Sequence, residues 1–304
     1  MNKDFSIAIM YAVTPCHAGS GSALGVVDLP IQRERHTNWP MIQASGVKGA
    51  FRANFERYAY NIKSENVGSS KKDFEILTQK LFGTDFFCFH DENNKKVLIG
   101  KGEGFSGSLS VGDAKILAYP MRSDVSPFVW MTCPAVLKRL QKDLSFTGEN
   151  IEKCKIPDVK ENEAVLIKGS ISGNVLLEDY EVKVLNDKKV EGFDVYFEGA
   201  DRLILVSDEV FNYGVTNCTQ IMAQIKIDSK TGTTAEGSLR YQEELPSDTL
   251  MYTVIHWGDS KNTAEDKLKA DTIKRFITEE VIKNHIQIAG DETCGRGIFE
   301  LTWK

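Results

Sequence analysis

The order of elements expected at the two ends of the chain constrains the fold more than any other feature. At the start, alternating large apolar residues over 5–13 predict a strand, followed by a loop of small residues and a helix over 45–62. At the end, a helix capped by Thr263 and Asp266 precedes a strand at 286–288, a glycine-rich loop at 290–297 and a strand at 298–303. This order predicts an α+β fold with antiparallel pairing, such as a ferredoxin-like unit.

The middle of the chain does not fit a doubly wound sheet, because regular alternation of strand and helix is missing there. Short apolar runs predict strands at 105–119, with an interruption at Gly112, and at 165–167, 175–177, 193–197, 203–206 and 251–255. Helices are expected over 74–81 and from Thr132 to Leu144. Alternation over 221–227, a turn at 228–232 and the run 233–241 predict a β-hairpin.

Composition narrows the class of protein. Hydrophobic residues make up 41% of the chain and charged residues 26%, which is typical of a packed globular protein. The net charge of −6 argues against indiscriminate coating of nucleic acid but allows a local basic groove. No apolar run approaches the roughly 20 residues that span a bilayer, so no membrane partner is expected.

The six cysteines are widely spaced, and this excludes the CxxC motifs of zinc sites and thioredoxin-type proteins. They are also too sparse for a disulfide scaffold, so reduced thiols and a cytoplasmic location are expected. The N-terminal apolar segment could imitate a short signal peptide. Its alternation, together with Asp4 and Pro15, favours a strand instead.

A basic patch lies close to the N-terminus, where residues 31–60 hold five cations and two carboxylates. Lys48 and Arg52 are four residues apart and share one edge of the predicted helix. With Ser45 as N-cap and Gly46 beside it, the helix start could grip a phosphate. A solvated helix with a simple serine cap explains this segment equally simply. Arg33 and Arg35 extend the patch.

Two further segments could contact a ligand. The loop 290–297 ends in Gly295, Arg296 and Gly297, a pattern that lets backbone approach a phosphate closely, although a plain hairpin loop gives the same pattern. The run from Tyr241 to Glu244 after the hairpin could complete an active site. It could equally be a solvated charged turn before Pro246.

Two residues near the first strand could carry chemistry. Asp28 lies in a loop among apolar residues and is either a turn residue, a metal ligand or the group that positions an attacking 2′-hydroxyl of RNA. His17 is either an acid/base or a hydrogen-bonded structural histidine.

These segments together resemble a known family. The motifs are His-Ala-Gly-Ser-Gly at 17–21, Asp-Leu-Pro at 28–30, Ser-Gly-Val-Lys-Gly-Ala-Phe-Arg at 45–52 and Gly-Asp-Glu-Thr-Cys-Gly-Arg-Gly at 290–297. They resemble the repeated backbone subunit of the type III-B CRISPR effector, the Cmr complex, within the RAMP superfamily. Near-continuous similarity over 14–52 carries the resemblance, while 63–200 matches only in general character.

The resemblance implies a fold with a ferredoxin-like (RRM-like) palm, an inserted β-hairpin thumb and lid segments. The whole chain, 1–304, is then a single RAMP domain. Its palm comprises approximately 1–62, 105–145 and 247–304, its lid or finger insertion approximately 63–104, and its thumb region approximately 170–246.

The resemblance also implies a function in antiviral defence. Copies of the chain stack along a CRISPR RNA with other Cmr subunits, including the small subunit, and cleave complementary single-stranded target RNA at regular intervals. Cleavage would need a divalent metal ion, Mg²⁺ or Mn²⁺, without a dedicated protein cage. The alternatives are a non-catalytic RNA-binding scaffold of the same architecture and, more remotely, an enzyme acting on small nucleotides.

Site residues carry over motif by motif. Asp28 is implied to be catalytic and a candidate metal ligand, and His17 is a second catalytic candidate. Tyr241 and Glu243 are auxiliary candidates, although Gln242 and Glu244 depart from the expected pattern of acidic and aromatic residues. The implied RNA-binding residues are Ser45, Gly46, Lys48, Arg52, Arg33, Arg35, Gly295, Arg296 and Gly297.

Overall fold

A computed structural model of the chain describes residues 4–59, 71–84, 87–90, 96–99, 106–149, 151–261 and 267–304. Its strands are β1 (Phe5–Ala12), β2 (Met41–Ile42), β3 (Phe87–His90), β4 (Lys96–Ile99), β5 (Leu109–Val111), β6 (Ala114–Arg122), β7 (Phe128–Thr132), β8 (Glu163–Lys168), β9 (Gly173–Leu177), β10 (Tyr180–Leu185), β11 (Leu203–Val206), β12 (Gln220–Gln224), β13 (Arg240–Glu244), β14 (Leu250–Trp257), β15 (His285–Gln287) and β16 (Ile298–Trp303).

The α-helices are α1 (Ala44–Tyr58), α2 (Lys71–Phe82), α3 (Pro134–Thr147), α4 (Asp208–Asn217) and α5 (Ala270–Arg275). Short 3₁₀ turns are η2 (Ile151–Lys153), η3 (Asp194–Tyr196) and η5 (Glu292–Cys294), and η4 (Phe276–Val281) is a π-helix that continues α5. The chain is therefore a mixture of helices and strands, as its sequence predicts.

One large sheet organises the molecule. Twelve strands belong to it, and its main path runs β15-β16-β1-β14-β6-β7-β11-β8-β10-β9, with β2 on β6 and β5 on β14. Most neighbours are antiparallel, including β1 with β14 and with β16. The pairs β11–β7 and β10–β8 are parallel. The strands expected at both ends of the chain therefore lie side by side in one sheet, where β15, β16 and β1 form its first three strands.

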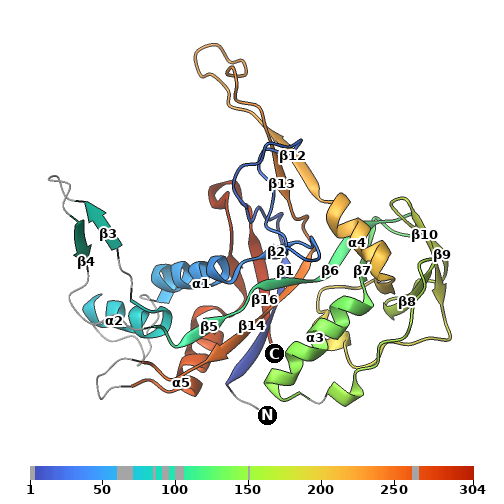
Figure 1. Cartoon of the computed structure of the whole chain (residues 1–304), viewed down its shortest axis with the longest axis horizontal. Coiled ribbons are helices and arrows are strands. Elements are labelled where there is room, and N and C mark those ends of the chain that lie inside the picture. The colour runs from blue at the N-terminus through green and yellow to red at the C-terminus, as the bar shows by residue number, and fades with distance from the viewer. Residues whose placement is uncertain are drawn as a thin grey trace.

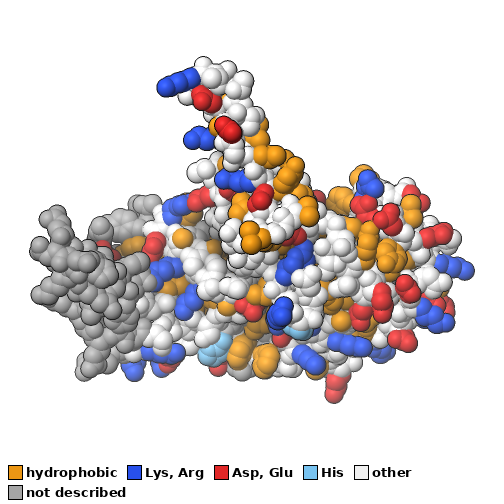
Figure 2. All heavy atoms as spheres, turned by 45° about the horizontal axis from the view of Figure 1, so that its top comes forward, with side chains coloured by type: hydrophobic (Ala, Val, Ile, Leu, Met, Phe, Trp, Pro, Cys, Tyr) orange, Lys and Arg blue, Asp and Glu red, His pale blue; other side chains and the backbone are white. Residues whose placement is uncertain are grey.

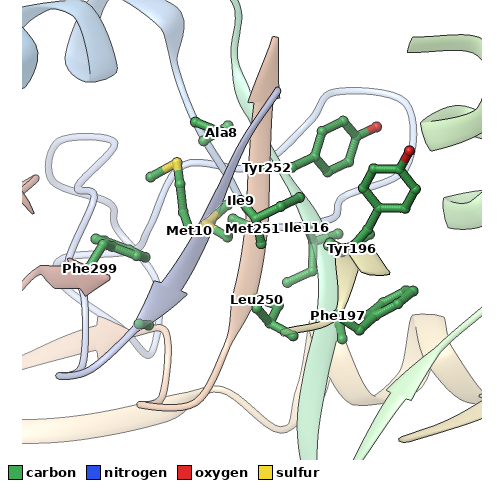
Figure 3. Packing of buried hydrophobic residues seen from close by; sticks show 14 of the residues in the cluster. Ala8, Ile9, Met10, Ile116, Tyr196, Phe197, Leu250, Met251, Tyr252 and Phe299 are labelled. Atoms are coloured by element: carbon green, nitrogen blue, oxygen red, sulfur yellow. The ribbon is translucent and has the colours of Figure 1, made fainter. Parts of the chain in front are cut away.

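The core lies where β1, β14 and β6 run side by side (Figure 3). Ile9 and Met10 of β1 pair with Tyr252 and Met251 of β14, and these side chains are buried together. The residues between the large apolar ones in β1 are buried too, because α3 contacts β1 and β6 and because α1 packs on the neighbouring β16. Burial on both faces explains why alternation in this strand is weak.

The structure differs from the predicted elements at several places. Residues 193–197 form the 3₁₀ turn η3 rather than a strand, with Phe193 and Phe197 buried through a turn. Helix α4 was not expected, because its four charged or amide residues obscure a short apolar stripe. The last helix begins at Ala270, while Thr263 and Asp266, its expected cap, lie outside the described residues.

A two-stranded hairpin projects from the body (Figure 1). It consists of β12 and β13, which pair in antiparallel register from Gln220 with Glu244 to Gln224 with Arg240, and of the connection between them. Helices α1 and α2 lie on one side of its base, and α3, α4 and β8–β10 lie on the other. The loop that follows β1 reaches the base of this hairpin, which brings two distant parts of the sequence together.

Candidate functional site

The loop after β1 adds a third strand-like edge to the hairpin. Leu29 N–H donates to the Tyr241 carbonyl at 3.0 Å, and Glu243 N–H donates to the Leu29 carbonyl at 2.9 Å. Because β12 pairs with the opposite edge of β13, this segment of the loop closes the free edge at the hairpin base. The motif around Asp28 is thereby positioned by backbone hydrogen bonds to residues more than 200 positions away.

Asp28 is fixed to β13 through its side chain as well. Its carboxylate oxygen Oδ2 accepts a hydrogen bond from the Tyr241 backbone N–H at 2.7 Å. Within the described residues, nothing donates to the other oxygen, Oδ1. The residue is half-buried, and the loop 19–26 before it is exposed. Asp28 therefore presents one oriented carboxylate oxygen beside an accessible loop.

His17 is anchored two residues further along the same strand. Its ring nitrogen Nδ1 lies 2.7 Å from the Glu243 carbonyl oxygen. Since a carbonyl only accepts, Nδ1 carries the hydrogen, and Nε2 of the neutral ring keeps its lone pair. Nε2 also abuts Gly19, where an added Cβ would come within 2.7 Å of it. The anchors of His17 and Asp28 are two residues apart on β13, which is about 7 Å at the rise of a β-strand.

Glu243 has a structural task in this arrangement. Its Oε1 accepts from Arg33 Nη2 at 2.5 Å and from the Thr219 hydroxyl at 2.7 Å, and its Oε2 accepts from Ile31 N–H at 3.0 Å. Burial alone would raise the pKa of Glu243, but these hydrogen bonds outweigh burial and lower the pKa below the ordinary value. Both carboxylate oxygens are engaged, so the arrangement positions the loop and gives no support to direct catalysis by Glu243.

Arg33 is equally engaged. Besides Glu243, it donates to the carbonyl oxygens of Asn38 at 2.8 Å and Val215 at 3.0 Å. Its guanidinium thus joins the loop after β1 to α4 and β13 and is not free to grip RNA. Arg35, by contrast, is exposed and has no hydrogen-bond or ion-pair partner within the described ranges.

The glycine-rich loop also binds the hairpin base. Arg296 Nε donates to Glu244 Oε1 at 3.2 Å, and Gln242 Nε2 donates to Asp291 Oδ2 at 2.5 Å. Gly297 donates its N–H to the Pro15 carbonyl at 2.8 Å and has a φ of +72°. A Cβ there would come within 2.0 Å of the Ile288 carbonyl oxygen, which explains the glycine. Gly295, also at φ +72°, has open space around it.

The start of α1 differs from the expected phosphate grip. Gln43 is the N-cap, and Ser45 is the exposed second residue of the helix, so the prediction of Ser45 as N-cap is wrong. The Asp113 carboxylate accepts from the Ala44 N–H at 2.7 Å and already places a negative charge at this helix end. Gly46 is exposed, but its N–H donates to the Gln43 carbonyl at 2.8 Å.

The two helix cations have different surroundings. Arg52 bonds Glu56 at 2.8 Å and the Gly83 carbonyl at 3.4 Å, so its charge is partly used within the fold. Burial, followed by the positive charges of Arg52 and Lys261, lowers the pKa of the Lys48 amine. Three cations thus converge near Lys48, a surface to which an anionic strand is attracted.

Exposed apolar side chains follow one flank of the hairpin (Figure 2). Cross-strand register places Ile221 opposite Glu243 and Ala223 opposite Tyr241 on one face. The exposed large residues of the hairpin are Ile221, Ile225, Ile227, Leu239 and Tyr241, and Leu24 and Val26 of the loop after β1 are exposed as well. Such a projecting apolar edge suits contact with the faces of bases or with another protein.

A metal-binding cage is not present in the described part of the chain, where no group of three or more His, Cys, Asp or Glu side chains converges. Asp28 offers one carboxylate oxygen, Oδ1, that accepts no hydrogen bond within the described residues, and carboxylate oxygens are ligands of the type that Mg²⁺ prefers. Separately, no helix within the described ranges has the length and apolar character needed to cross a bilayer.

Sequence reasoning missed several residues that build this site. Thr219, Gln242, Asp291 and Asp113 each hold a segment that is distant in sequence. Gln242 and Asp291 lie within the runs 241–244 and 290–297 that the sequence singles out, but no local pattern indicates which segments they hold, and none marks Thr219. Asp113, at the interruption of the predicted strand 105–119, carried a signal, because Asp is frequent at turns and at helix starts.

Comparison with known proteins shows the family. A family model described as the RAMP superfamily matches residues 9–300. The protein named CRISPR system Cmr endoribonuclease Cmr4 from Pyrococcus furiosus is 31% identical over 307 residues, covering 97% of this chain and 94% of that protein. The chain therefore belongs to the RAMP superfamily. Within it, the predicted likeness to the type III-B backbone subunit is confirmed.

Solved structures agree on the fold. The crystal structure of oligomeric Cmr4 from Pyrococcus furiosus is 24% identical with a TM-score of 0.67, covering 99% of this chain and 97% of that one. A type III-B Cmr-beta complex bound to cognate target RNA contains a chain that is 19% identical with a TM-score of 0.71, covering 98% of this chain and 96% of that one.

Proposed function

We propose that this chain is a CRISPR RNA-binding backbone subunit of a type III-B effector and cleaves complementary target RNA at regular intervals. The observation that carries the proposal is the attachment of the Asp28 carboxylate and the His17 imidazole to one edge of β13, at the base of a projecting hairpin. The named endoribonuclease relative and the likeness to a target-bound Cmr complex support it.

The chemistry follows from these two groups. A ribose 2′-hydroxyl attacks the adjacent phosphorus and loses its proton, while the bond from phosphorus to the 5′-oxygen breaks and the departing oxygen takes a proton from water. The products end in a cyclic 2′,3′-phosphate and a 5′-hydroxyl. Asp28 Oδ1 orients the 2′-hydroxyl, and His17 Nε2 is available to take its proton. An apolar hairpin edge that unstacks one step of the duplex would bring the 2′-oxygen into line with the leaving oxygen.

A divalent ion, Mg²⁺ or Mn²⁺, would be held by Asp28 and RNA phosphates and would supply charge stabilisation for the phosphorane. No protein cage is required for that role, and the single free carboxylate oxygen fits it.

The finer architecture belongs to the same proposal. The sheet around β1, β14 and β6 with α1 and α3 corresponds to a ferredoxin-like palm, and the β12–β13 hairpin corresponds to the tip of a thumb. Strands β9, β10 and β11, within the predicted thumb region 170–246, pair in the large sheet. We therefore infer that the thumb proper is shorter and centres on 220–244, with the lid or finger insertion at 63–104.

The partners follow from the same role: CRISPR RNA, target single-stranded RNA, further copies of this chain in a filament and other Cmr subunits, including the small subunit, in the cytoplasm. Contact with the guide by Lys48 and Arg35 needs no base recognition, because base pairing between guide and target supplies the sequence specificity.

The test is a cleavage assay on the reconstituted complex with complementary RNA labelled at one end. The proposal predicts a ladder of evenly spaced products that appears only when Mg²⁺ or Mn²⁺ is supplied. A complex that binds and protects the target without periodic products in either metal would instead establish the non-catalytic scaffold. Tight binding of mononucleotides by the isolated chain without affinity for RNA would favour the nucleotide enzyme.

A further inference from the structure

A cavity of about 400 Å³ lies beside the glycine-rich loop, away from Asp28. The C-terminal half of α1 forms one wall, β15 with the end of η4 forms another, and Glu292 of η5 closes one side. Its lining residues are Ala50, Ala53, Asn54, Arg57, Tyr58, Val281, His285, Ile286, Gln287, Glu292 and Ile298. The volume is enough for one nucleobase with its sugar, and the site described above uses none of these side chains directly.

One wall holds a polar atom without a partner. Asn54 lines the cavity, and its Oδ1 is one of two buried side-chain atoms in the described ranges that accept or donate no hydrogen bond. Such an atom is rare in a folded protein, because burial removes its water and nothing replaces it. The oxygen is itself buried, so the Asn54 side chain would have to turn to present it to an N–H group of a ligand in the cavity, and it would lose no hydrogen bond of that oxygen in turning.

The neighbouring helix residues leave room for a flat group. Ala50 and Ala53 project only methyl groups from α1 into the cavity. Opposite them, η4 is a π-helix that ends at Val281, with Ile282 N–H donating to the Ile277 carbonyl at 2.7 Å. A π-turn widens a helix by one residue and occurs frequently at functional sites.

The rim of the cavity presents flat side chains that a base could stack on, and its cation, Arg57, is already ion-paired. Arg57 forms an ion pair with Glu292, which raises the pKa of its guanidinium, and the guanidinium lies 5.9 Å from the centroid of the exposed Tyr58 ring. The positive charge of Arg57 is therefore already balanced. A guanidinium plane and a phenol ring beside an apolar floor suit a nucleobase better than a phosphate.

The cavity communicates with the candidate site through consecutive residues. Asp291 accepts from Gln242 of β13, while Glu292 pairs with Arg57 at the cavity rim. The loop 290–297 therefore contacts both the hairpin base and the rim of the cavity, so an RNA strand that passes the hairpin base runs close to the cavity.

We propose that this cavity receives a single nucleobase from the RNA strand that the chain grips, with Asn54 accepting from the base and Arg57 and Tyr58 stacking at its edge. The assignment rests on the proposed RNA-binding function and adds a base subsite to it. Every base has an N–H or NH₂ group that can donate to the Asn54 oxygen, so the subsite accepts any sequence.

The test combines protein variants that alter the cavity with RNA from which single bases have been removed. Ala53→Leu places an isobutyl group in the cavity with only a small loss of helix propensity, and Asn54→Ala removes the acceptor. Ala53→Ser is the matched control that leaves the volume open. Reconstituted complexes are titrated with RNA in which one abasic nucleotide is moved step by step along the guide and, separately, along the target.

In the wild-type complex and in the Ala53→Ser complex, abasic substitution at one position per subunit repeat, in one strand, should weaken binding about fivefold or more. In the Ala53→Leu and Asn54→Ala complexes the same substitution should have no added effect. The strand that shows the effect identifies the source of the base.

Equal abasic effects in the wild-type, Ala53→Leu and Asn54→Ala complexes, with cleavage intact, would overturn the base subsite and leave the proposed function standing. Wild-type complex without any affinity for RNA would overturn the proposed function itself. Binding of free AMP or UMP by the wild-type chain that Ala53→Leu abolishes, without any abasic effect, would show a mononucleotide site and contradict a base from the strand.

Discussion

The residues of the candidate site are held through partners far away in sequence. Asp28 and Tyr241 are 213 positions apart, and Arg33 and Glu243 are 210 apart. The Glu243 carboxylate holds the loop after β1 with two hydrogen bonds, from the Ile31 N–H and the Arg33 guanidinium, and accepts a third from the Thr219 hydroxyl beside β12. Acidic residues that look catalytic in a motif can thus serve to position the loop that carries the reacting group.

Replacing Glu243 by Gln should destabilise the protein by about 3 kcal/mol at pH 7, because the Arg33 charge is left without its counter-charge in a mostly buried place. The folded-state pKa of Glu243 is lowered from 4.5, so its stabilising contribution is complete above that value and is lost as pH falls through the folded pKa. Urea unfolding of wild type and variant from pH 3 to 7 measures the difference.

The gap between wild type and Glu243→Gln should narrow below about pH 4.5. Thr219→Val is the matched control, since it removes one hydrogen bond to the same carboxylate and keeps the ion pair. Stability curves for wild type and Glu243→Gln that stay parallel down to pH 3 would show that the carboxylate is not held in its charged form.

The sequence predicted the positions of the chemical groups but not their partners. His17 and Asp28 could be singled out because their loop is rich in small residues and resembles a family motif. The ion pairs could not be predicted, because charges that are distant in sequence meet only through the tertiary fold. These pairs are Arg33 with Glu243 and Arg296 with Glu244. Among the predicted RNA-binding arginines, Arg35 has no hydrogen-bond or ion-pair partner within the described residues. No local feature of the sequence distinguishes it from Arg33.

At the scale of elements, α1 is the part of the molecule best suited to contact a phosphate backbone. Its cation without an ion-pair partner among the residues that the structure describes is Lys48, whose pKa is lowered by burial and by the nearby charges of Arg52 and Lys261. Binding an anionic strand would relieve that repulsion. Arg52 contributes less, because Glu56 and the Gly83 carbonyl already share its hydrogen bonds.

Lys48→Ala should weaken guide binding and reduce the slope of log affinity against log salt by about 0.7, the value for one phosphate contact with a single strand. Arg52→Ala should change the slope less, and the double variant should resemble Lys48→Ala. Filter binding over a salt series measures both slopes. Lys142→Ala on α3 is the exposed control. A slope that Lys48→Ala leaves unchanged would mean that this amine faces no phosphate.

Elements with a strong apolar pattern were predictable, and those fixed by tertiary contacts were not. The strands β1, β6, β11, β14 and β16 and the helices α1 and α3 follow their patterns closely. The sequence did not predict that α1 begins after Gln43. The Ala44 N–H at this helix start donates to Asp113, which lies between β5 and β6, and Ser45 is not the cap. Residues 193–197 have the composition of a strand, but both phenylalanines are buried from a 3₁₀ turn.

At the scale of the whole molecule, the projecting hairpin concentrates exposed apolar residues on one flank (Figure 2). Replacing Ile225 and Leu239 by Ser should leave guide binding intact and slow periodic cleavage, because a polar edge unstacks bases less effectively. Quantifying each product band against time checks this. Unchanged rates at every position would show that the apolar flank has another partner.

Asp28 is the carboxylate to which we assign the orientation of the attacking 2′-hydroxyl. The decisive measurement is single-turnover cleavage of complementary RNA by reconstituted complexes with Asp28→Asn, alongside the exposed-loop control Asp187→Asn. We predict unchanged target affinity with cleavage slowed at least about 100-fold at every position for Asp28→Asn, and wild-type rates for the control. Periodic cleavage by the Asp28→Asn complex at the wild-type rate would contradict the account.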